Sequence, residues 1–217
     1  MRAGTFRTPR FRVVVPLLIA LLATLTPSAS AQSLYRYAPA TQWGYTYAGP
    51  AANSASGTTP KSANLEKQST IDVNYINFPD WAKKELQLAV DIWAANFQSK
   101  VAITIDATWS SSQSVAVLGS ARPGGYFAGF SGAPDSSLWY PSGLANALAG
   151  KDLDVRNAEM LINVNSRASW NRRGDGAPTT REYDLKSVFI HEIGHGLGFL
   201  SNDSYDSYLG YGSIEQP

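Results

Sequence analysis

A strand, a helix and a second strand follow one another between residues 71 and 109, and this order most constrains the fold. Ile71 to Tyr75 alternates apolar and polar residues, which is typical of a half-buried strand. From Asp80, which we expect to cap it, to about Gln98, apolar residues at spacings of three and four predict an amphipathic helix. The alternation returns from Val101 to Trp109. Two strands joined through a helix favour a crossover unit and a mainly parallel sheet.

The rest of the chain predicts one more strand and one more long helix. Ala158 to Val164 alternates again and predicts a third strand. Residues 110–154 are rich in Ser, Gly and Pro, and predict only a short helix from Leu144 to Leu148. A polar loop over residues 170–180 precedes a helix that Asp184 can cap. Strands and helices together predict an α/β (α+β) fold class.

The N-terminus has the pattern of an export signal. Four arginines accompany an apolar run from Val13 to Leu25 that is too short to span a bilayer as a helix. Ala29-Ser30-Ala31 fits the small-x-small pattern that signal peptidase recognises. We therefore expect residues 1–31 to be a cleaved signal peptide and the protein to be secreted. The remaining 186 residues suffice for a flexible arm over residues 32–68 and one folded domain over residues 69–217.

Composition narrows the range of partners and metal ligands. Without the signal, 14 basic residues remain against 17 acidic ones, a net charge near −3. No later stretch is densely basic, which argues against nucleic acid, and no second apolar run is long enough for a membrane. The chain has no cysteine, which excludes thiolate ligands, a cysteine nucleophile and latency through a cysteine that caps a metal.

The segment His191-Glu192-Ile193-Gly194-His195 carries the candidate chemistry and contains both histidines of the chain. Residues four apart lie one turn apart on the same face of a helix, so His191 and His195 can bind one metal ion. Zn²⁺ suits two nitrogen ligands and keeps a position open for water. It lowers the pKa of that water to about 7, and Glu192 can then accept the proton as general base. The simpler alternative is a surface helix that happens to carry two histidines.

Three glycines accompany this segment. Gly194, Gly196 and Gly198 fall within or at the end of the predicted helix. Each interior glycine costs about 1 kcal/mol relative to alanine. We expect close approach of another backbone, or a sharp exit of the chain at Gly198, to compensate for this cost.

The sequence HEIGHGLGF, preceded by the segment AEMLINVN, resembles the zincin metallopeptidases, and more closely the metzincin-type HExxHxxG pattern of secreted bacterial proteins. The resemblance implies a zincin-like mixed sheet with an active-site helix. It also implies that His191 and His195 bind zinc, that Glu192 is the general base, and that Gly198 makes the turn after the helix. By the same resemblance, the strand from Ala158 to Asn165 is the edge strand that holds an extended protein or peptide substrate.

The third metal ligand departs from that pattern. Metzincins place the third ligand, a His or Asp, three residues after the glycine of the HExxHxxG pattern. In this chain that glycine is Gly198, and the position three residues later is Ser201. Four alternatives remain open, namely Asp203, Asp206, Glu215 and a residue beyond Pro217 if the sequence is truncated. Asp203 is the first choice if the chain is complete.

Two other functions compete with a zinc endopeptidase. A catalytically inactive zincin-like domain could bind extracellular partners without a complete ligand set. An adhesion module could use the loop that contains Arg173-Gly174-Asp175. Gly and Asp are usual turn formers, so we interpret this tripeptide as a turn. The oligomeric state and calcium sites are not predicted.

Overall fold

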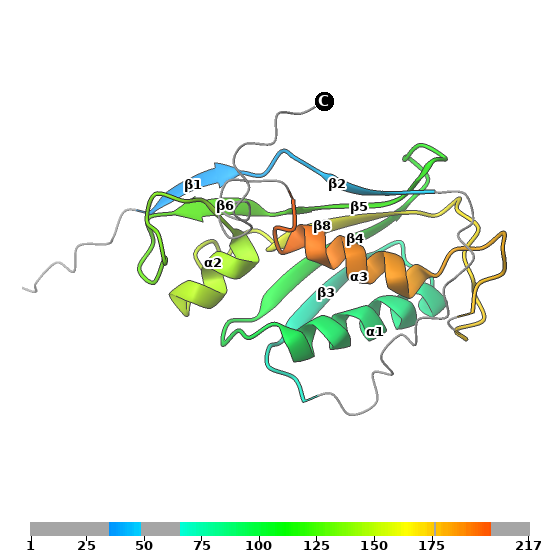
Figure 1. Cartoon of the computed structure of the whole chain (residues 1–217), viewed down its shortest axis with the longest axis horizontal. Helices are drawn as coiled ribbons and strands as arrows, with labels where there is room; N and C mark the ends of the chain where they lie inside the picture. The colour runs from blue at the N-terminus through cyan, green and yellow to red at the C-terminus, as the bar shows by residue number, and fades with distance from the viewer. Residues whose placement is uncertain (1–34, 49–65, 176, 201–217) are drawn as a thin grey trace, which may run out of the picture. The chain divides into compact units, whose positions relative to one another are not determined.

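The computed structural model describes residues 35–48, 66–175 and 177–200, which form two sheets and three helices (Figure 1). The α+β fold class is therefore confirmed. The helices are α1 (Asp80–Asn96), α2 (Ser142–Ala149) and α3 (Leu185–Gly196). The larger sheet contains β2 (Gly44–Tyr47), β3 (Ile71–Ile76), β4 (Ile103–Ser110), β5 (Val117–Pro123) and β8 (Met160–Asn165).

The larger sheet is mixed, with its strands in the order β2-β5-β8-β4-β3. Strands β3, β4 and β8 run parallel, whereas β5 is antiparallel to β8 and β2 is antiparallel to β5. The crossover from β3 through α1 to β4 is present as predicted, with Ile71 opposite Ile103. A parallel pair needs such a connection because one strand must return to the start of the next.

Helix α1 begins one residue earlier than its predicted cap implies. Asp80 is the first helical residue and Pro79 occupies the cap position, without a side-chain capping bond. The prediction that Asp80 caps the helix is therefore wrong. Instead, its carboxylate accepts a hydrogen bond from Lys83 Nζ at 2.9 Å, one turn further along.

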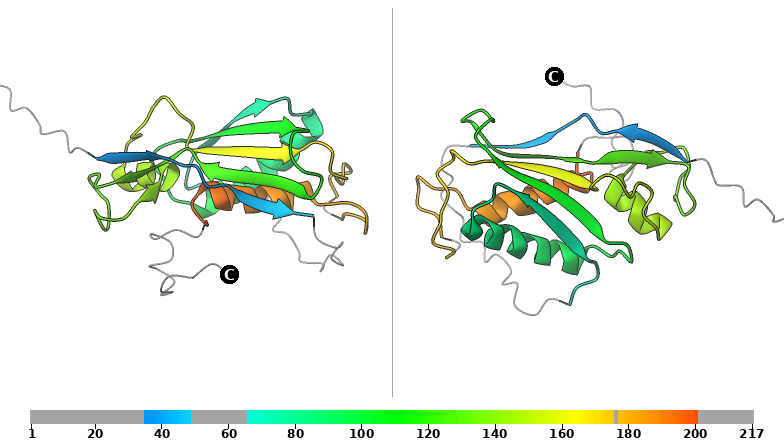
Figure 2. Two further views of the ribbon diagram at one scale, coloured as in Figure 1. Left: turned by 90° about the horizontal axis from the view of Figure 1, so that it is seen from above. Right: turned by 180° about the vertical axis from the view of Figure 1, so that it is seen from behind.

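Helices α1 and α3 cover one face of the larger sheet (Figures 1 and 2). Of the predicted stripe on α1, Ala82, Leu86 and Ala89 are fully buried. The helices also meet through a polar contact, because Trp93 Nε1 donates a hydrogen bond to the carbonyl oxygen of Ile190 at 2.9 Å. The core between these helices and the sheet includes Ile103, Ile105, Met160, Ile162, Phe189 and Ile193. Burying an apolar side chain of this size stabilises the fold by about 1.5–3 kcal/mol.

The segment between β4 and β8 contains more structure than its composition predicted. Besides β5 it forms β6 (Gly125–Ala128) and β7 (Tyr140–Pro141). In a smaller sheet, β6 lies between β1 (Arg36–Pro39) and β7 and pairs with both. Helix α2 contains the short helix predicted over residues 144–148. A second apolar cluster lies here, consisting of Phe127, Phe130, Tyr140, Ala145 and Leu153.

The predicted substrate-binding edge is wrong. Strand β8 lies between β4 and β5, so both of its edges are already paired along the strand. A paired strand has no free N–H and C=O groups for an extended peptide. The strand that lies further out is β5, and its outer edge carries β2.

Several predictions fall partly or wholly outside the described residues. The predicted signal peptide over residues 1–31 lies outside them. So do Ser201 and the candidate third ligands Asp203, Asp206 and Glu215. Within the arm predicted over residues 32–68, the described part contributes β1 and β2, which are paired in the sheets. No helix in the described ranges is both long and apolar enough to cross a membrane.

Candidate active site

Helix α3 begins at a local signal that the sequence displays. Asp184 is the N-cap, as predicted, and its carboxylate accepts hydrogen bonds from the backbone N–H and the hydroxyl of Ser187. The helix ends at Gly196, and Gly198 follows with a φ of 104°. This positive φ gives the sharp exit that was predicted, because only glycine adopts it without steric strain.

The glycines of α3 are matched to side chains rather than to another backbone. A Cβ atom at Gly196 would lie 2.7 Å from Met160 Sδ, and one at Gly198 would lie 2.3 Å from Pro141 Cγ. Gly194 has only ordinary contacts, with Trp93 at 3.5 Å from its would-be Cβ. Close packing on Met160 of β8 therefore compensates for the helical glycine at position 196, whereas Gly198, after the helix, packs on Pro141 of β7.

The two histidines lie next to each other on α3. Their ring centroids are 4.4 Å apart and the ring planes are nearly perpendicular, at 88°. His195 Nδ1 lies 2.9 Å from the carbonyl oxygen of Phe199. A carbonyl can only accept, so Nδ1 carries the proton and Nε2 keeps its lone pair for a metal. Partial burial, and then the charge of His195, lower the pKa of His191, which favours its neutral, metal-binding form.

Glu192 lies between α3 and the outer strands of the sheet and is fully buried. Its Oε1 accepts a hydrogen bond from the Thr46 hydroxyl at 2.6 Å. Its Oε2 has no hydrogen-bond partner among the described residues. Burial raises the pKa of Glu192 to about 7, although the hydrogen bond from Thr46 lowers it. A buried carboxylate oxygen without a partner is costly, and such groups mark functional sites.

Strand β5 makes room for this carboxylate. A Cβ atom at Gly119 would lie 2.8 Å from Glu192 Oε1. The small residue at this position of β5, which helped to make the strand hard to predict from the sequence, is therefore required by packing. Neither Gly119 nor Thr46 was predicted as a site residue, because no local pattern connects them with a helix far along the chain.

The described residues supply two of the ligands that a zinc ion would need. Two imidazoles from one helix face, one of them oriented by a backbone carbonyl, are a common zinc-binding arrangement. Glu192 follows His191 on the same helix, and its unpartnered Oε2 is available as a proton acceptor. Within the described ranges, no three His, Cys, Asp or Glu side chains lie together as a metal site. The candidate third ligands lie outside those ranges, so the structure does not place them.

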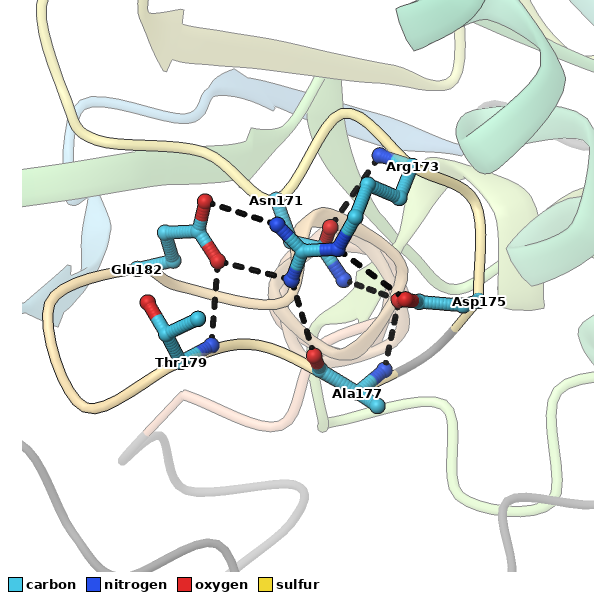
Figure 3. Close-up of polar contacts among 6 residues, drawn as sticks. All are labelled: Asn171, Arg173, Asp175, Ala177, Thr179 and Glu182. Carbon is cyan, nitrogen blue, oxygen red and sulfur yellow. Dashed lines mark hydrogen bonds and ion pairs between the residues drawn. The ribbon is translucent and has the colours of Figure 1, made fainter.

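The polar loop before α3 is held by an internal network of charges (Figure 3). Arg173 bonds Glu182 through Nη1 and Nη2, at 3.0 and 2.8 Å, and Asp175 through Nε at 3.0 Å. Asn171 Nδ2 donates to Asp175 at 2.7 Å. Gly174 has a φ of 69°, in accord with the predicted turn. The guanidinium group and the carboxylates thus bind one another within this loop.

Comparisons of the chain with known protein-family models, with curated proteins and with solved structures found no match. The function must therefore be inferred from the residues that α3, β5 and β2 bring together.

Proposed function

We propose that this protein is a secreted zinc-dependent metalloendopeptidase that hydrolyses peptide bonds in protein or peptide substrates. The observation that carries the proposal is the fully buried Glu192, whose Oε2 lacks a partner among the described residues. It lies on the same helix as His191 and His195, whose rings are 4.4 Å apart. The export signal predicted over residues 1–31 supports action outside the cell.

Each residue has a distinct role in this proposal. His191 and His195 would hold the ion through neutral imidazole nitrogens, and the Phe199 carbonyl orients the ring of His195. A zinc ion held there would supply an acidified water and would polarise the carbonyl group of the substrate. Glu192 accepts a proton from water and returns it to the leaving amine.

The test combines metal analysis with one isosteric substitution. Purified protein should contain zinc, lose casein cleavage on chelation and regain it when zinc is restored. Glu192→Gln should keep zinc and lose cleavage by about 10²–10⁴-fold, the usual contribution of a general base. Glu66→Gln is the matched control, because Glu66 is exposed and distant in the sequence from Glu192. This variant should cleave like wild type. Equal cleavage by wild type and Glu192→Gln would refute the role of Glu192.

A catalytically inactive zincin-like binding or adhesion domain is the second candidate. It is favoured by one observation, that the described residues supply two histidines but no third ligand. Zinc bound without any cleavage by the wild type would support an inactive binding domain. Protein that binds no zinc at all would support adhesion instead.

A further inference from the structure

Two residues that face each other across β2 and β5 meet the same atom of α3. The register places Thr46 directly opposite Gly119. The Thr46 hydroxyl donates a hydrogen bond to Oε1 of Glu192 at 2.6 Å, and a Cβ atom at Gly119 would lie 2.8 Å from that oxygen. Thr46 thus binds Oε1, and the missing side chain of Gly119 leaves room for it. We call this pair the Thr46–Gly119 cradle.

The other carboxylate oxygen of Glu192 has different surroundings. Oε2 is buried with the rest of the side chain and has no hydrogen-bond partner among the described residues. The two oxygens of an ionised carboxylate are chemically equivalent, and a hydrogen bond to such a charged acceptor is strong. The cradle therefore distinguishes one oxygen from the other, and Oε2 is the one left to accept a proton.

The backbone of β2 holds Thr46 in place on its C-terminal side. The register of β2 shifts between Thr46 and Tyr47, and such a bulge changes the direction of the side chains beside it. Beyond the bulge, the Ala48 N–H donates to the carbonyl oxygen of Ala116 at 2.7 Å, and Ala48 packs on the main core. Threonine is branched at Cβ, which restricts the rotation of its side chain. The direction of the Thr46 hydroxyl is therefore well defined.

We infer that the Thr46–Gly119 cradle positions the carboxylate of Glu192, fixing Oε1 so that Oε2 is the oxygen presented for proton transfer. Thr46 acts through Glu192, so it is a positioning residue and not a catalytic one. The inference rests on the proposed function, because the orientation of this carboxylate matters for activity if Glu192 is a general base. A catalytic group that is misplaced by about 1 Å can lower the rate by about 10²-fold.

Two substitutions separate the hydroxyl of Thr46 from its shape. Thr46→Val keeps the branched shape without the hydroxyl, and Thr46→Ser keeps the hydroxyl. In Thr46→Val, kcat and kcat/KM for a casein-derived peptide should fall together by about 10–100-fold with little change in KM, because the contact acts on the transition state. Thr46→Ser should restore most of the rate. Thr108→Val is the matched control, because Thr108 is a half-buried residue of β4 whose hydroxyl has no hydrogen bond within the described residues.

Carboxyl-carbon NMR of the zinc-free protein provides a readout that does not depend on activity. Glu192→Gln identifies the Glu192 resonance by removing it. Loss of the hydrogen bond to Oε1 should shift this resonance in Thr46→Val, whereas Thr46→Ser and Thr108→Val should leave it near its wild-type position. The zinc content of Thr46→Val should equal that of wild type, because neither histidine is changed.

The outcomes separate this inference from the proposed function. A lower kcat and a shifted Glu192 resonance in Thr46→Val, both restored in Thr46→Ser, support the inference. If Thr46→Val cleaves like wild type while Glu192→Gln does not cleave, the inference fails and the proposed function stands. If wild type cleaves nothing, the proposed function fails, and a shift that serine reverses still supports the cradle. An unchanged Glu192 resonance in Thr46→Val overturns the inference in either case.

Discussion

Gly196 on α3 and Met160 on β8 pack so closely that a Cβ atom at position 196 would lie 2.7 Å from the sulfur of Met160. The helix that carries both histidines therefore lies against the sheet at a distance that glycine permits. Gly194, two residues earlier, has only ordinary contacts. On the same helix, therefore, position 196 has no room for a Cβ atom and position 194 does.

This contrast predicts the stability of two alanine variants. Gly196→Ala should lower the free energy of unfolding by about 1–3 kcal/mol, because overpacking forces helix and strand apart. Gly194→Ala should be neutral or should raise it by up to about 1 kcal/mol, because alanine favours the helix. Urea denaturation of both variants measures the difference. Equal destabilisation would show that the packing at Gly196 is not the constraint.

Gly119 should matter for activity as well as for stability. In Gly119→Ala, a methyl group meets Glu192 Oε1 at 2.8 Å, and the buried carboxylate must shift. Displacement of a catalytic group by about 1 Å can lower the rate by about 10²-fold. Gly143→Ala is the matched control, because its new methyl group would have contacts no closer than 3.6 Å. Casein cleavage should fall in the first variant and persist in the second.

Zinc should stabilise the folded chain through both histidines. A ligand that binds only the folded state, at 100 times its dissociation constant, adds about 2.7 kcal/mol. Thermal melting with added zinc should therefore shift upward for wild type and for Glu192→Gln. The shift should disappear in His191→Gln and in His195→Gln. A zinc-dependent shift that survives in both histidine variants would place the ion elsewhere.

The loop network of Figure 3 predicts a pH dependence at acid pH. The bonds from Arg173 are the main cause that lowers the pKa of Glu182 from 4.5 to about 2. A carboxyl group whose pKa is lower in the folded than in the unfolded chain stabilises the fold at pH values above its unfolded pKa. This stabilisation is lost as the pH falls from about 4.5 towards 2. Arg173→Met should return the pKa of Glu182 towards 4.5 and reduce the loss of stability in that window.

Asp175 is an internal comparison for the same variant. Its pKa is lowered to about 2 first by the Asn171 side chain, then by the Ala177 N–H, and only third by Arg173. Carboxyl-carbon NMR of Arg173→Met should therefore show a smaller rise for Asp175 than for Glu182. Equal rises would contradict the distribution of hydrogen bonds in this loop.

Periodicity and capping made much of the fold predictable. The pattern of residues 71–109 predicted β3, α1 and β4, because each element buries one face and so repeats its apolar residues at a fixed spacing. Asp184 and Gly198 marked both ends of α3 through local chemistry. Strand β5 escaped prediction because the small residues Gly119, Ser120 and Ala121 interrupt its apolar pattern. At Gly119 the small size reflects a carboxylate from another element.

The sequence by itself determined the candidate chemistry, because the four-residue spacing of His191 and His195 on a helix is a local property. Only the tertiary structure decided what surrounds it. Sheet pairing placed β8 inside the sheet and β5 further out, and brought Thr46 to Glu192 across 146 positions of the chain. Such contacts depend on strand order and register, which hydrogen bonds between distant segments establish and which no local spacing encodes.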